Sequence, residues 1–140
     1  MKLSFTIVGN QEDEQGNPIP KAKLTQGQQW TSRAQRYGAW KRHVRASALD
    51  AVIAQNKPSW MVVRLTQNQH LFDKDEVVGG RLDIRITWAN EAHGDPESIF
   101  GSIADSLFAQ DKHLVGSISA EHGDAGAVAV DIDVKLISEK

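Results

Sequence analysis

Three carboxylates stand around one short apolar segment, and their type and spacing suit metal chemistry. Asp95 and Glu97 precede the segment and Asp111 follows it in the stretch HGDPESIFGSIADSLFAQDKHLVG. Oxygen ligands of this kind bind Mg²⁺, which takes a few carboxylates together with water and phosphate oxygens. A magnesium ion held in this way can activate water for phosphodiester cleavage. The chain has no cysteine, so any metal must be held by oxygen or histidine.

The same acids also have a structural explanation. Asp95 suits the N-cap of a helix and Pro96 its first position, and acidic residues in a first turn stabilise a helix by roughly 0.3–1 kcal/mol each. His93 and His113 flank the acids, and either could be a base, a phosphate contact or merely exposed. Asp111 would join the other two acids only if packing bends the chain back, so their convergence is a hypothesis.

Apolar periodicity predicts the elements that must position these acids. Alternation in RLDIRITW indicates a strand, and apolar residues at steps of three and four after Ser32 indicate an amphipathic helix. The expected elements are strands at 3–8, 60–67, 81–88, 113–121 and 127–137, and helices at 32–55 and 96–108. The last two strands are expected to form a hairpin across HGDAG. The order β-α-β-β-α-β-β predicts a single α+β domain over residues 1–140, a mixed sheet with two helices packed on it.

Charge is distributed unevenly along the chain, although the formal net charge is only −2. Residues 1–64 hold ten Lys and Arg against four Asp and Glu, whereas residues 65–140 hold six against fourteen. This asymmetry fits a basic surface that holds a nucleic acid beside an acidic site, and it equally fits a solvated surface with salt bridges. The sequence has no pattern of a signal peptide and no membrane span, so we expect a cytoplasmic protein.

The segment GDPESIFGSIADSLFAQDKHLVG resembles the signature of RusA-type Holliday-junction resolvases. In that family an Asp-x-Asp-Asn stretch opens a helix, a lysine follows on it, and then come Asp-Ala-Leu and a last aspartate. The stretches NPIPKAK and RYGAWKRHVRASA also resemble the family's basic loop and first helix, so the resemblance covers most of the chain. By motif, Asp95, Glu97 and Asp111 take the places of the metal ligands, and Asp105 and Leu107 fall on the Asp-Ala-Leu.

This resemblance implies a Mg²⁺-dependent endonuclease that resolves four-way DNA junctions in recombination and repair, as a homodimer encoded by a phage-derived gene. Asp95, Glu97 and Asp111 would be catalytic and would hold the metal. Phosphate contacts would come from basic side chains in the loop, at the start of the first helix and after the second: Lys21, Lys23, Arg33, Arg36 and Lys112.

Departures from the family pattern leave two alternatives open. Glu97 stands in place of Asp, Ser98 in place of Asn, and Gly101 in place of the expected lysine, at a position expected to face solvent. The first alternative is therefore a junction-binding module of the same fold that cleaves weakly or not at all. The second is a structural or protein-interaction domain in which the acids only cap the helix.

Overall fold

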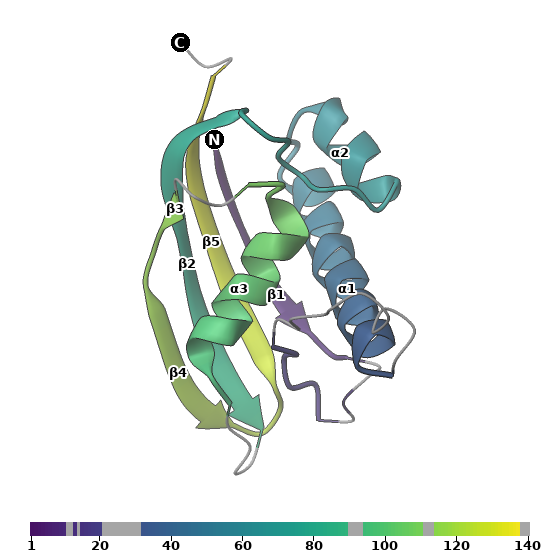
Figure 1. Cartoon of the computed structure of the whole chain (residues 1–140), viewed down its shortest axis with the longest axis vertical. Helices are drawn as coiled ribbons and strands as arrows, with labels where there is room; N and C mark the ends of the chain where they lie inside the picture. The colour runs from purple at the N-terminus through teal and green to yellow at the C-terminus, as the bar shows by residue number, and fades with distance from the viewer. Residues whose placement is uncertain (11–12, 14, 21–31, 90–93, 111–113, 138–140) are drawn as a thin grey trace.

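The computed structural model describes residues 1–10, 13, 15–20, 32–89, 94–110 and 114–137. These residues form three helices and a mixed five-stranded sheet, which confirms the α+β prediction (Figure 1). The elements in chain order are β1 (Lys2–Val8), α1 (Ser32–Ala54), α2 (Ser59–Thr66), β2 (Val77–Ala89), α3 (Pro96–Leu107), β3 (Leu114–Val115), β4 (Ile118–Gly123) and β5 (Ala127–Leu136).

β2 is the central strand of the sheet. One of its edges pairs with β5 in the antiparallel sense, and β1 pairs antiparallel with the far side of β5. Its other edge pairs in the parallel sense with β3 near its start and with β4 near its end. The sequence alternation explains the two faces of this strand, because its apolar side chains are buried and the intervening ones point to the other face: Leu82, Ile84, Ile86 and Trp88 are the buried members.

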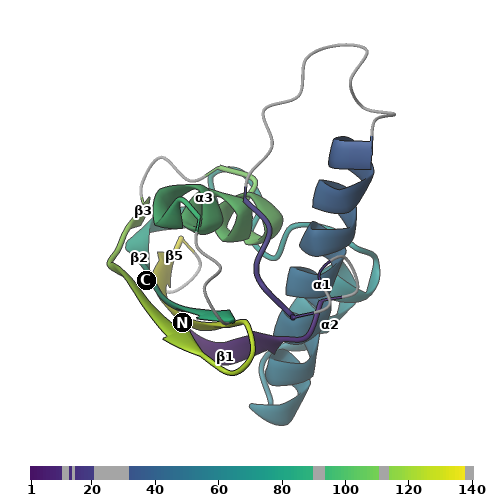
Figure 2. The ribbon, with the colours of Figure 1, turned by 90° about the horizontal axis from the view of Figure 1, so that it is seen from below.

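α1 and α3 lie on the same side of the sheet and form the second layer of the domain (Figure 2). The predicted stripe of α1 is confirmed, because its members at steps of three and four are buried: Tyr37, Trp40, Val44, Ala48 and Val52. α3 likewise buries Ile99, Ile103, Ala104 and Leu107. The opposite face of the sheet carries polar side chains, an arrangement that antiparallel sheets commonly show.

The prediction of a strand at residues 60–67 is wrong, because this segment is helix α2. Its run of Trp, Met and Val has high strand propensity, but propensity gives way to tertiary packing. Met61 and Leu65, one helical turn apart, are buried, and α2 packs on α1. Pro58 stands just before the helix, where its missing N–H costs nothing.

The predicted hairpin between the last two strands is also wrong. β4 and β5 do not pair with each other, because β2 lies between them and pairs with both. The connection after β4 therefore crosses the end of β2, where the N–H of Gly126 donates to the carbonyl oxygen of Gln15 at 2.8 Å. The stretch predicted as one strand at 113–121 is also divided, into β3 and β4.

Candidate functional site

The start of α3 is built as the sequence predicted. Pro96 occupies the first turn, and Asp95 is the N-cap, with extended backbone angles. Asp95 Oδ1 accepts a hydrogen bond from the backbone N–H of Glu97 at 3.1 Å, and Oδ2 accepts one from Ser98 Oγ at 2.9 Å. Both oxygens of the cap are therefore already held by the first turn of the helix.

Close packing against the central strand positions this helix start. An ideal Cβ built on Gly94 would lie 3.1 Å from Cη2 of Trp88, so the backbone at Gly94 approaches the indole ring more closely than most side chains would allow. The N–H of Ala89, at the end of β2, donates to Asn17 Oδ1 at 2.8 Å. The backbone at Gly94, just before Asp95, is thus packed against the end of β2.

Asp95 and Glu97 are both exposed to solvent. Each carboxylate oxygen of Asp95 keeps a lone pair beyond its cap hydrogen bond, and Glu97 has no hydrogen bond or ion pair from its carboxylate among the described residues. Two such carboxylates fit the preference of Mg²⁺ for one or two protein oxygens completed by water and phosphate. The positive end of the α3 dipole also favours anions at this position.

Asp111 lies outside the described residues, as do Lys112, His93 and His113. On one side of this gap, the N–H of Ala109 donates to the carbonyl oxygen of Phe72 at 2.9 Å. On the other side, Leu114 pairs with Gly80 near the start of β2. These described flanks lie at the end of α3 opposite to Asp95, and a helix of twelve residues is roughly 18 Å long. Convergence of the three acids stays a prediction, and the described pair is Asp95 and Glu97.

Asp105 lies on the same face of α3 as Glu97, but it contacts α1. The phenol of Tyr37 donates to Asp105 Oδ2 at 2.7 Å, and Lys41 Nζ lies 3.7 Å from the same oxygen and 4.9 Å from the centre of the Tyr37 ring. Burial of Tyr37, followed by its hydrogen bond to Asp105, raises the pKa of the phenol above its usual range. Asp105 therefore joins the two helices.

A polar seam continues from Asp105 along the contact between α1 and α3. Trp40 Nε1 donates to Ser102 Oγ at 3.0 Å, and Arg45 Nε donates to the carbonyl oxygen of Ser106 at 2.8 Å. Burial lowers the pKa of Arg45, while the charge of Asp105 opposes that shift. This seam was not predicted from the sequence, although two serines four residues apart within an apolar stripe are a signal for it.

Gly101 is half-buried, so this position is less open to solvent than expected. It lies one turn before Asp105, whose carboxylate turns toward α1. The row formed by Glu97, Gly101 and Asp105 thus begins at an exposed carboxylate and reaches the contact with α1 at Asp105.

Among the predicted DNA contacts, Arg36 is the one whose side chain the structure describes. It is exposed near the start of α1, and its guanidinium lies 4.0 Å from Asp13. Arg33 lies on the same helix, with its side chain outside the described part, and Lys21 and Lys23 lie outside it altogether.

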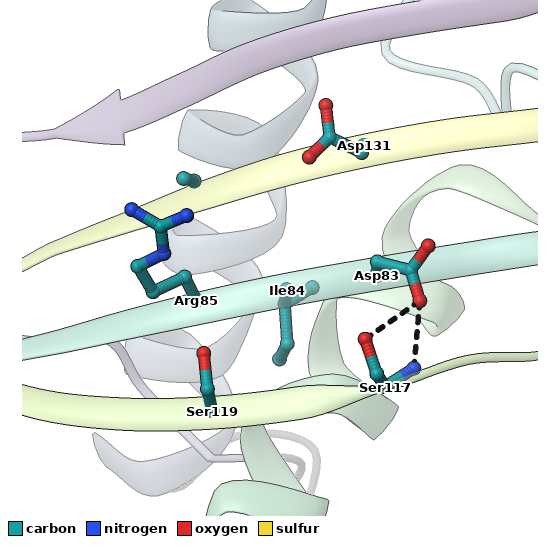
Figure 3. A pocket seen from close by; sticks show the side chains of 7 residues that line it. Asp83, Ile84, Arg85, Ser117, Ser119 and Asp131 are labelled. Atoms are coloured by element: carbon teal, nitrogen blue, oxygen red, sulfur yellow. Dashed lines mark hydrogen bonds between the residues drawn. The ribbon is translucent and has the colours of Figure 1, made fainter.

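A shallow polar pocket lies on the open face of the sheet, away from α3 (Figure 3). Asp83 Oδ1 accepts hydrogen bonds from the N–H and the hydroxyl of Ser117, both at 2.8 Å. Hydrogen bonds from Arg81, and then from Ser117, lower the pKa of Asp83. Arg85 also lines the pocket, and none of the hydrogen bonds or ion pairs of the described chain engages its guanidinium.

No model of a known protein family matches this chain, and no curated protein matches it in sequence. The helices of the described part include none with the length and apolar composition of a bilayer span. Within that same part, no three Asp, Glu or His side chains form a group that could hold a metal ion. The two exposed acids at the start of α3 therefore define the candidate site.

Proposed function

We propose that this chain is a Mg²⁺-dependent endonuclease domain for branched DNA, similar to the RusA-type resolvases, with Asp95 and Glu97 as metal ligands. The single observation that carries the proposal is the exposure of both carboxylates at a helix start anchored on the end of the central strand. The agreement of this helix with the motif resemblance supports it further, because Pro96 opens the helix at the expected place.

The residues at this site have separable roles in the proposal. Asp95 and Glu97 hold the metal, with Asp111 as the third predicted ligand, and the bound ion supplies an activated water and charge stabilisation at phosphorus. The positive end of the α3 dipole attracts the phosphate. Arg36 at the start of α1 contacts a neighbouring phosphate and positions the DNA without reading its sequence.

A second candidate is a junction-binding module that does not cleave. Two observations favour it: both oxygens of Asp95 are engaged in the cap, and Gly101 offers no cation on the face that follows Glu97. Arg36 and the other predicted contacts would then bind phosphates without cleavage, and the acids would stabilise the helix.

A nicking assay on a synthetic four-way junction tests the proposal. We expect Mg²⁺-dependent nicks that EDTA abolishes and that linear duplex does not show. Asp95→Asn should abolish nicking and leave junction binding intact or tighter, because the loss of negative charge weakens metal binding and reduces repulsion of phosphate.

Asp124→Asn is the matched control, because Asp124 is an exposed carboxylate in the turn after β4, outside α3. It should nick at the wild-type rate. Junction binding without nicking by the wild-type protein would favour the binding module. Absence of any salt-dependent preference for the junction over linear duplex would instead favour a structural or protein-interaction domain.

A further inference from the structure

The two edges of the sheet differ in what covers them. At the β1 edge, α1 supplies hydrogen bonds to the strand backbone: Gln55 Nε2 donates to the carbonyl oxygen of Ser4 at 2.6 Å, and His43 Nε2 lies 3.1 Å from that of Val8. α1 also packs along this strand. Another chain cannot add to β1 without displacing these contacts.

The β4 edge has no comparable cover in the described part of the molecule. All six residues of β4 are exposed, and the described elements that contact it are β2 on its inner side and α3 on one face. An open strand edge presents a row of N–H and C=O groups to which another strand can pair. Charged side chains and proline usually protect such an edge, and β4 carries Glu121 as its single acid, with no lysine and no proline.

The pairing with β2 shows which backbone groups point outward. The N–H of Ile84 donates to the carbonyl oxygen of Ser117 at 3.0 Å, so Ser117 directs its carbonyl toward β2. Direction alternates along a strand, so Ser119 also faces β2, whereas Ile118 and Ala120 direct their N–H and C=O groups outward. An added strand would bond first to these two residues.

Charge on the open face indicates what that strand is. Arg85 of β2 stands beside Ser119 of β4 in the parallel register, and both side chains lie on the open face (Figure 3). Arg85 has no partner among the described hydrogen bonds and ion pairs, and neither has the exposed Glu121 two residues beyond Ser119. Arg85 and Glu121 are therefore offset by two residues along neighbouring strands. A two-fold axis between them in sequence would place the glutamate of one copy in line with the arginine of the other.

We propose that β4 pairs antiparallel with β4 of a second copy of this chain, about a two-fold axis at Ala120. Ser119 then lies opposite Glu121 of the second copy, so Arg85, Ser119 and that glutamate form one row across three strands. Strands are about 4.8 Å apart, so the two charged residues are separated by roughly 10 Å of backbone, which their long side chains span above the small serine. In Figure 3 the Arg85 side chain points toward β5, so the proposed ion pair requires this side chain to rotate toward Ser119. The ion pair occurs twice by symmetry.

Other registers are less favourable for the same charges. A two-fold axis at Glu121 would place the two glutamates directly opposite each other, which destabilises an antiparallel pair. With the axis at Ala120, the outward groups of Ala120 bond to their symmetry mates, and the two sheets join into one. Because the axis is perpendicular to the joined sheet, the helices of both copies cover one face and the polar faces combine on the other.

Sedimentation velocity over a concentration series tests this pairing. We expect a wild-type dimer that Arg85→Glu or Glu121→Arg weakens on the order of tenfold or more, because each change loses two ion pairs and introduces like charges. The double variant Arg85→Glu, Glu121→Arg should recover the dimer, since the pair re-forms in the opposite sense. Lys2→Glu is the matched control, an exposed charge on the covered β1 edge, and should leave the dimer unchanged.

Ala120→Pro provides a test that does not depend on charge. It removes an outward N–H at the two-fold axis, and proline is tolerated on edge strands. The variant should be monomeric, with an unchanged far-UV circular dichroism spectrum. A wild-type protein that stays monomeric at its highest soluble concentration overturns the pairing, as does a dimer that survives all of these changes. Junction nicking is measured separately, so loss of the dimer proposal and loss of the proposed function are distinguishable.

Discussion

The two ends of α3 carry acids of the same chemistry in opposite environments. At the start of the helix, Asp95 and Glu97 are exposed, and the hydrogen bonds of Asp95 within the described residues stay in its own first turn. Near the end, Asp105 accepts a hydrogen bond from the phenol of Tyr37 and lies beside Lys41, so it joins α3 to α1. Acidic residues on one helix therefore have different roles. The difference arises from the side chains that α1 places next to Asp105.

Removal of Asp105 should have the largest effect on stability. Asp105→Ala leaves the buried hydroxyl of Tyr37 without its acceptor, and we expect the free energy of unfolding to fall by about 2–3 kcal/mol in urea titrations. Glu97→Ala, on the same helical face, should cost only about 0.3–1 kcal/mol, through the helix dipole. Equal losses for the two variants would remove the distinction between the ends of α3.

A pair of substitutions at Asp95 separates capping from metal binding. Asp95→Ala should lower the free energy of unfolding by about 1 kcal/mol, because the N-cap is lost. Asp95→Asn should cost almost nothing, because asparagine caps as well as aspartate does. Both variants should lose Mg²⁺-dependent nicking. Thermal melts should therefore distinguish the two variants by stability, whereas their nicking rates should not differ. Nicking that follows stability in both variants would indicate that the acid serves the helix alone.

The smallest effect is expected at Gly101, between the two ends. Gly101→Lys should raise the free energy of unfolding by up to about 1 kcal/mol through helix propensity, with higher junction affinity and an unchanged or faster nicking rate. Its half-buried position reduces the expected gain. A lower melting temperature than that of the parent would show that the glycine is needed for close packing, and would remove this face of α3 from the proposed site.

Local signals in the sequence were sufficient for some elements and not for others. The start of α3 was predictable because an N-cap aspartate and a following proline act within a few residues. The same holds for residues 81–88 of β2, where the alternation is intrinsic to the strand, whereas the start of this strand at Val77 was not predicted. Helix α2 was predicted wrongly because its β-branched and aromatic residues carry strand propensity, and only packing on α1 makes Met61 and Leu65 a helical stripe.

Contacts between distant parts of the chain could not be predicted in this way. Tyr37 and Asp105 are 68 residues apart, and no local pattern relates them. The pairing of β2 with both β4 and β5 is likewise a property of the whole sheet, whereas the turn-forming HGDAG stretch between those strands indicated a hairpin. At the candidate site, spacing was informative for Asp95 and Glu97, which share one turn, and uninformative for Asp111, whose position depends on the path of the chain after α3.

Among the described strands β1 pairs with β5 alone, and this pairing has a consequence for the order of events during synthesis. β1 precedes the other elements of this chain, yet the strand to which it bonds begins at Ala127. The amino group of Met1 also donates to the carbonyl oxygen of Val134. On the ribosome, the backbone of β1 therefore stays without its strand partner while more than a hundred further residues emerge. During this time it is hydrated or contacted by α1. Folding should complete late and cooperatively, and a nascent chain stalled before Ala127 should remain open to proteases.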